Sequence, residues 1–124
     1  MQPDAQAWTP LCDVDKLTVE RGVTALVRGH AIAVFLTQDG SVYAIGNNDP
    51  FSRSTALGRG IVGMRGDVPF VGSPAHKHAF DLRTGVCLDD VWVSVPCYLV
   101  RVVDGVVHIG PRTNPRHRIS RSDL

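Results

Sequence analysis

The chain has 124 residues, the size of a single domain, and no break in composition along it argues for two domains. Hydrophobic residues make up 44% of the sequence and charged residues 20%, which is typical of a folded globular protein and excludes a disordered chain. The formal net charge is only +1, so no global electrostatic field favours nucleic acid or a membrane surface as a partner.

The cysteines and the first residues bear on the cellular compartment. Cys12, Cys87 and Cys97 are odd in number and show no C-x-x-C spacing, which argues against a disulfide scaffold and a zinc ribbon. We expect three reduced, mostly buried side chains. The opening M-Q-P-D-A-Q-A-W lacks the regions of a signal peptide, and no apolar run approaches the roughly 18 residues of a membrane span. A cytoplasmic protein without a membrane segment is therefore predicted.

Short β-rich runs dominate the chain in order. Residues 23–27 and 31–36 flank a tight connection centred on Gly29, and Asp39-Gly40 leads into residues 41–45. Asp-Gly between apolar runs predicts a hairpin, because glycine accepts a positive φ. The same pattern recurs late in the chain, where Asp104-Gly105 joins residues 95–103 to residues 106–109. This spacing predicts an all-β antiparallel sandwich or barrel of six to ten strands.

Two irregular stretches interrupt the strands. Residues 47–66 are rich in glycine and are predicted to form one long loop, a length that usually serves a function. A second irregular stretch is expected at residues 71–76. Single helical turns are expected at residues 13–17 and 54–57, and no longer helical period occurs.

The last residues are basic. We divide the chain into a domain at residues 1–110 and a flexible C-terminal tail at residues 111–124. From residue 110 onward, four arginines stand against Asp123, a net charge of +3. A basic arm that docks on an acidic partner is the alternative interpretation. Nucleic acid is disfavoured, because no aromatic residue lies among the arginines.

Two short motifs carry the candidate chemistry. N-N-D-P-F-S stands at residues 47–52 and S-P-A-H-K-H at residues 73–78, before F-D-L-R-T-G at residues 80–85. This frame resembles the Rieske family, whose loops read C-P-H and C-P-x-H-G before an F-D-x-x-T-G turn. The resemblance implies a Rieske-like antiparallel β-sandwich with a two-loop subdomain of the cluster-binding type.

The ligand positions of that frame are degenerate. A Rieske [2Fe–2S] cluster needs two thiolates and two imidazoles. Asp49 and Ser73 stand at the cysteine positions and Phe51 at the first histidine position, while His76 matches the second histidine. A hydroxyl is a poor substitute for a thiolate, and a phenyl ring has no lone pair to donate. The sequence therefore predicts that the cluster is absent, with no catalytic, cofactor-binding or metal-binding residue on this chain.

A more specific resemblance covers nearly the whole chain. The sequence is similar to the small subunit of the NADH-dependent assimilatory nitrite reductase. The matching segments are Trp8, Cys12, N-x-D-P-F-S at 47–52, Leu57, R-G-I-V-G at 59–63, S-P-A-H-K-H-A-F-D-L at 73–82, T-G-V-C-L-D-D at 84–90 and Y-L-V-R-V-V-D-G at 98–105.

The resemblance implies a role in an enzyme complex. That complex reduces nitrite to ammonia with NAD(P)H in nitrate assimilation. FAD, sirohaem and an iron–sulfur cluster are then expected on the large subunit and none of them on this chain. The chain would be a non-redox accessory subunit, not catalytic when isolated, that docks on the large subunit and supports it.

Several residues are candidates for that contact: Phe51, Ile61, Met64, His76 and His78. Phe51 either fills the space of the cluster or belongs to an exposed apolar rim. Adjacent Asp89 and Asp90 are expected to form a turn, a salt bridge to Arg83 or Arg101, or a partner contact.

Two alternative functions stay open. His76 and His78 would face the same way in a strand and, with Asp49, could hold one metal ion, which would make the chain a Rieske-type electron-transfer protein resembling a ferredoxin. Such a histidine pair is more often a surface feature. The second alternative is an interaction module of a ring-hydroxylating oxygenase.

Overall fold

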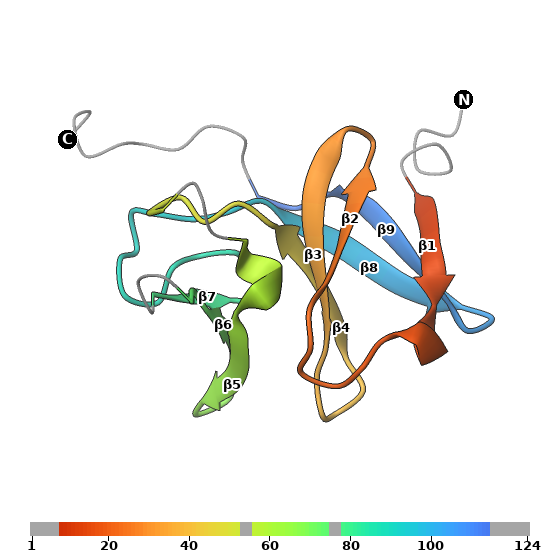
Figure 1. Cartoon of the computed structure of the whole chain (residues 1–124), viewed down its shortest axis with the longest axis horizontal. Coiled ribbons are helices and arrows are strands. Elements are labelled where there is room, and N and C mark those ends of the chain that lie inside the picture. Colours follow the sequence, from red (N-terminus) through yellow and green to blue (C-terminus); the bar gives the residue numbers. More distant parts are fainter. Residues whose placement is uncertain (1–7, 53–55, 75–77, 115–124) are drawn as a thin grey trace.

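The computed structural model describes residues 8–52, 56–74 and 78–114, and these form nine strands and two 3-10 turns. The all-β antiparallel fold that the sequence predicts is confirmed (Figure 1). The elements are β1 (Thr9–Asp13), η1 (Val14–Lys16), β2 (Val23–Val27), β3 (His30–Leu36), β4 (Val42–Gly46), η2 (Leu57–Arg59), β5 (Ile61–Arg65), β6 (Val68–Gly72), β7 (Ala79–Asp81), β8 (Cys97–Val103) and β9 (Val106–Arg112).

The strands form two sheets. Six of them make one antiparallel sheet in the order β1-β9-β8-β4-β3-β2, and the other three make a small sheet in the order β5-β6-β7. The small sheet lies beside the β3–β4 side of the large one, away from β1 (Figure 1). The described residues between β4 and β8 in sequence therefore form a subdomain attached to one side of the large sheet.

Within two of the hairpins, a tight turn with left-handed backbone connects the strands. The β2–β3 turn places Arg28 at φ 49° and Gly29 at φ 83°, and the β8–β9 turn places Asp104 at φ 52° and Gly105 at φ 78°. The Arg28 side chain also joins distant strands, since its guanidinium donates to the Thr9 hydroxyl at 2.6 Å and to the Gly110 carbonyl at 2.8 Å. These bonds hold the β2–β3 turn against β1 and β9, so the large sheet curls on itself.

Strand β3 is buried on both faces. Ile32 and Val34 belong to a core inside the curled sheet, whereas Ala33 and Phe35 belong to a second core under the small sheet. All four are fully buried, although neighbours in a strand point to opposite faces. The continuous apolar run of β3 thus reflects two covered faces, and the second core fixes the subdomain to the large sheet.

The prediction of one long loop at residues 47–66 is wrong for the second half of that stretch, which forms η2 and β5. Its glycines serve close packing. A Cβ on Gly60 would lie 2.3 Å from the Gly72 carbonyl oxygen, and one on Gly63 would lie 2.9 Å from the Phe70 ring. The second irregular stretch is likewise shorter than predicted, because residues 71 and 72 belong to β6.

The C-terminal boundary also moves. β9 runs to Arg112, two residues past the expected end of the domain. Asn114 then ties the chain down: its side-chain amide donates to the Val95 carbonyl at 2.7 Å and accepts from the Cys97 amide at 3.1 Å. The rest of the predicted tail lies outside the described residues. Within the described part of the chain, no helix is long and apolar enough to cross a membrane.

Replacing Phe35 with alanine should remove a large side chain from the core that joins the two sheets. We expect a loss of about 3–5 kcal/mol in the free energy of unfolding, measured by urea denaturation. Leu26 is 76% exposed, so Leu26→Ala is the control and should change stability by no more than about 0.5 kcal/mol. Equal losses in the two variants would contradict the two-core arrangement.

Candidate functional site

Two loops meet at one end of the subdomain. The first follows β4 and the second joins β6 to β7. Asn47 anchors the first loop, because its side-chain oxygen accepts from the Gly58 amide at 2.8 Å and its carbonyl accepts from the Leu57 amide at 2.7 Å. The second loop is closed by the Ser73 amide, which donates to the His78 carbonyl at 2.8 Å. We call this end of the molecule the tip.

The two residues that stand at the cysteine positions of the Rieske frame form a hydrogen bond with each other. The Ser73 hydroxyl donates a hydrogen bond to the Asp49 carboxylate, and the other oxygen of that carboxylate accepts from the Phe51 amide at 2.9 Å. Asp49 is 1% exposed and Ser73 is 2% exposed. A buried carboxylate needs such partners, since leaving it unbonded is costly. A direct hydrogen bond therefore joins the two loops at the place where both thiolates would stand.

Phe51 packs across to the second loop. Its ring stacks on His78 with centroids 3.9 Å apart and an interplanar angle of 10°, and it also contacts the ring of Phe80 at 6.1 Å. Phe51 is half-buried and packs against the core under the small sheet. Of the two interpretations of this residue, its packing against the core favours the first, although the side chain remains partly exposed.

The donor set does not fit a [2Fe–2S] cluster. Asp49 and Ser73 use their oxygens on each other, and Phe51 offers no lone pair. The cysteines lie elsewhere: Cys12 is in β1, Cys87 is buried beside β7, and Cys97 begins β8. Among the described residues no three His, Cys, Asp or Glu side chains converge as metal ligands.

The single-metal alternative also loses support. It needs Asp49 as a ligand, and both carboxylate oxygens of Asp49 already accept hydrogen bonds from within the chain. His78 stacks on Phe51, and His76 lies outside the described residues.

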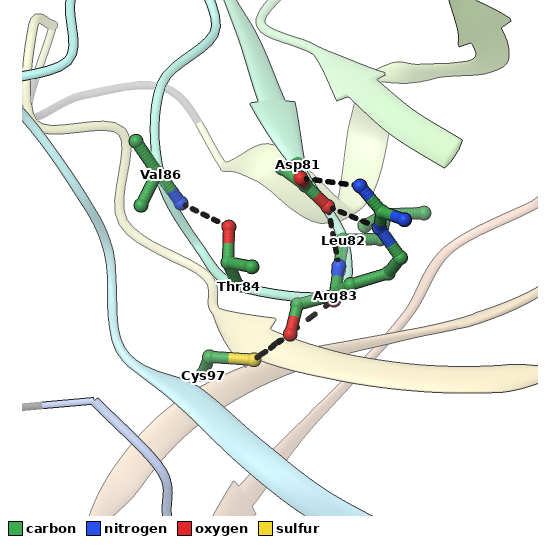
Figure 2. Close-up of polar contacts among 6 residues, drawn as sticks. All are labelled: Asp81, Leu82, Arg83, Thr84, Val86 and Cys97. Carbon is green, nitrogen blue, oxygen red and sulfur yellow. Dashed lines mark hydrogen bonds and ion pairs between the residues drawn. The ribbon is translucent and has the colours of Figure 1, made fainter. Parts of the chain in front are cut away.

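The F-D-L-R-T-G turn includes the end of β7 and is held by polar contacts of its own (Figure 2). The Arg83 guanidinium pairs with the Asp81 carboxylate at 3.2 Å, and the Cys97 thiol lies 3.4 Å from the Arg83 carbonyl. Burial raises the pKa of Cys97, which keeps the thiol protonated. This cysteine is thus a packing residue and not a reactive thiolate.

Asp89 has a different partner from those expected. It forms a salt bridge with Arg65 at 3.2 Å, while Arg83 pairs with Asp81 and Arg101 stacks over the Trp8 ring at 4.1 Å. The other Asp89 oxygen accepts from the Ala79 amide at 2.7 Å, and this bond is the main reason that the pKa of Asp89 is lowered. Asp89 thereby fastens the turn at residues 88–93 to the strand that follows the second loop.

Two of the predicted partner-contact residues, Ile61 and Met64, lie apart on β5. Ile61 pairs with Gly72, next to the second loop, and is 76% exposed, so it flanks the tip. Met64 pairs with Pro69 near the opposite end of the hairpin. Three positions separate Ile61 and Met64, so their side chains leave opposite faces of β5.

Sequence reasoning missed two exposed apolar residues at the tip. Val91 is 72% exposed and Trp92 is 43% exposed, in the turn that Asp89 fastens beside Ala79. Asp90 shapes this turn by accepting from the Trp92 amide at 3.1 Å. The segment C-L-D-D-V-W was a usable signal, because two turn-forming acids predict that the valine and tryptophan that follow them lie on a turn and not in a core.

Comparison with known proteins agrees with this geometry. The model of the Rieske-like [2Fe-2S] domain family matches residues 7–110. The Nitrite reductase (NADH) small subunit of Escherichia coli K12 is 38% identical over 103 residues, which is 82% of this chain and 95% of that protein. The chain belongs to the family of NADH-dependent nitrite reductase small subunits. The family resemblance drawn from the motifs is thus confirmed.

Two further relatives add detail. A crystal structure described as a putative NADH-dependent nitrite reductase small subunit from Mycobacterium tuberculosis is 46% identical, with a TM-score of 0.81, and the match covers 86% of this chain and 96% of that one. The Nitrite reductase [NAD(P)H] large subunit of Klebsiella oxytoca contains a segment that is 34% identical over 106 residues. That match covers 86% of this chain but 11% of the large subunit.

The bond between Asp49 and Ser73 can be tested by a double-mutant cycle. With Ser73→Ala, Asp49→Ala and the double variant, we expect a coupling energy of about 1–3 kcal/mol in urea denaturation, because each single change leaves a buried polar group without its partner. Thr37 and Asp39 form a similar hydroxyl–carboxylate bond at 2.6 Å with an exposed acid, so Thr37→Val and Asp39→Ala make a matched control cycle. The interpretation fails if the two cycles give the same coupling.

Proposed function

We propose that the chain is the accessory small subunit of a cytoplasmic NAD(P)H-dependent nitrite reductase, which reduces nitrite to ammonia in nitrate assimilation. It docks on the large subunit and supports it without carrying electrons. The observation that carries this proposal is the bond between Asp49 and Ser73, which occupies both thiolate positions. Reduction of nitrite to ammonia moves several electrons, and cofactors carry such chemistry.

The choice of partner has separate support. In the Klebsiella oxytoca relative, a segment similar to this chain is part of the large-subunit polypeptide itself. Because the two parts belong to one polypeptide in that organism, the segment is held near the rest of the large subunit at a high effective concentration. FAD, sirohaem and the iron–sulfur cluster of the proposed complex then belong to the large subunit.

The tip is the proposed docking surface. Ile61, Val91 and Trp92 expose apolar side chains around it, and exposed aromatic and aliphatic anchors of this kind dominate protein interfaces. The backbone beneath them is fixed by the bonds of Asp49, Asn47 and Asp89. A surface that is already rigid loses little entropy when it binds. His76 and His78 contribute to the same surface in this proposal, whereas Met64 does not.

Truncating an anchor should weaken the complex. Trp92→Ala and Ile61→Ala are each expected to raise the Kd for the large subunit by about tenfold or more, equivalent to about 1.4 kcal/mol or more. Calorimetric titration of each variant with the purified large subunit measures this change. Val103 has the same 43% exposure as Trp92 but lies at the β8–β9 hairpin, so Val103→Ala is the matched control. Unchanged binding by both tip variants would place the interface elsewhere.

The absence of a redox centre has its own test. After anaerobic incubation with iron and sulfide, the chain should show neither a visible absorption band nor an electron-spin signal, because its loops lack thiolate ligands. The variant Asp49→Cys/Phe51→His/Ser73→Cys restores the Rieske ligand types around His76, and a known Rieske ferredoxin controls the procedure. A cluster signal from the unmodified chain would overturn the non-redox role.

A further inference from the structure

A groove lies between the two sheets, near the end of the β5–β6 hairpin that is farther from the tip. Its volume is about 330 Å³. Apolar side chains of β4, β5 and β6 line it, chiefly Tyr43, Val62, Met64 and Pro69. Of the described residues that line it, Arg83 alone belongs to the Rieske frame, and none belongs to the proposed docking surface.

Three carboxylates from three separate turns converge on the groove. Glu20 precedes β2, Asp39 lies in the β3–β4 turn, and Asp67 lies in the β5–β6 turn. All three are exposed. Hydrogen bonds from the Thr37 hydroxyl and the Ser41 amide lower the pKa of Asp39, so its charge is kept at neutral pH. We call this feature, defined by Glu20, Asp39, Asp67, Tyr43, Val62 and Met64, the acidic groove.

Among the described residues that line the groove, the one cation is already paired. Arg83 lines the acidic groove, and both its Nε and its Nη2 donate to the Asp81 carboxylate at 3.2 Å (Figure 2). Its charge is therefore balanced locally, and the three carboxylates leave the groove with a net negative charge. An apolar floor with acidic rims suits a peptide that carries arginines, because their aliphatic stems pack on the floor while their guanidinium groups reach the rims.

The chain itself supplies such a peptide. Residues 115–124 contain Arg116, Arg118 and Arg121 against Asp123, with Ile119 among them. The segment has both the charge and the apolar group that the acidic groove would accommodate.

The segment also starts in the right place. The Asn114 side chain donates to the Thr84 carbonyl at 3.3 Å. Thr84 is the residue after Arg83, and Arg83 lines the groove. A second hollow, lined by Thr113, Tyr43 and Arg83, shares the last two residues with the acidic groove and so leads from the end of β9 towards it. When fully extended, the ten residues 115–124 reach about 33 Å. This length exceeds the length of a groove of about 330 Å³.

We propose that residues 115–124 of this chain bind in its own acidic groove, with their arginines at Glu20, Asp39 and Asp67. The interaction is intramolecular and is held by charge. It does not depend on the proposed docking at the tip, because the tip lies at the other end of the β5–β6 hairpin.

A spin label on the segment tests the proposal in the full chain. Ser122→Cys carries a nitroxide, in a background where the partly exposed Cys12 is replaced by serine. At low salt, we expect the amide signals of Gln38, Gly63 and Asp67 in the ¹⁵N-labelled chain to lose most of their intensity. The amides of Thr84 and Val95, beside the anchor point of the segment, should lose less than those of the groove. Trp92, at the tip, is the reference for no effect.

Charge variants provide the matched controls. Arg116→Glu/Arg118→Glu/Arg121→Glu and, separately, Asp39→Lys/Asp67→Lys should each abolish the broadening in the groove, and combining the two sets should restore it. Raising the salt from about 0.05 M to about 0.5 M should also reduce it, because screening shortens the range of the attraction. Asp39 and Asp67 are exposed, and amide spectra of each variant show whether the fold is kept.

Other occupants give different results. A mixture of ¹⁵N-labelled chain without nitroxide and unlabelled chain with nitroxide shows broadening only if a second copy fills the groove, and that result overturns the proposal. Broadening centred on Thr84 and Val95, with none at Gln38, Gly63 and Asp67, also overturns it, since the segment then stays near its anchor and leaves the groove for another partner.

Discussion

The structure depends on the burial of β3 on both of its faces. Ile32 and Val34 close the core inside the curled sheet, and Ala33 and Phe35 close the core under the small sheet. A strand that is covered on one side only would leave the β5-β6-β7 sheet without a surface to pack on. Because the small sheet is fixed in this way, the loops at its end and the groove at its other end keep constant positions relative to the large sheet.

The tip then shows how a cluster-binding frame holds its shape with other contacts. In a Rieske domain, metal ligands from two loops link those loops. Here the Ser73–Asp49 hydrogen bond and the stacking of Phe51 on His78 link the same two loops. Both contacts are made by side chains of the polypeptide itself. These contacts join the two loops without a metal ion between them, unlike the ligands of domains that an ion must gather.

Much of this was readable from the sequence, and the exceptions have physical causes. The hairpins were predicted because Asp-Gly turns act locally, as at Asp104-Gly105. The strand β5 was missed because Gly60 and Gly63 read as loop residues, whereas they permit close contact with Gly72 and Phe70. Such contacts join segments far apart in sequence. The bond between Asp49 and Ser73 was invisible for the same reason, although the degenerate positions themselves could be named. The exposure of Trp92, in contrast, follows from a local turn.

The three replacements at the tip are better understood together than one by one. Loss of the ligands alone would leave a polar cavity between the loops, with the cost that unfilled polar sites carry. Asp49 and Ser73 instead satisfy each other, and Phe51 packs on the second loop and on the core. Each replacement thus contributes to holding the loops together, while none of the three supplies the thiolate or imidazole that a [2Fe–2S] cluster needs. A frame whose loops are joined by such contacts is suited to binding, since a preorganised surface loses little entropy when it binds.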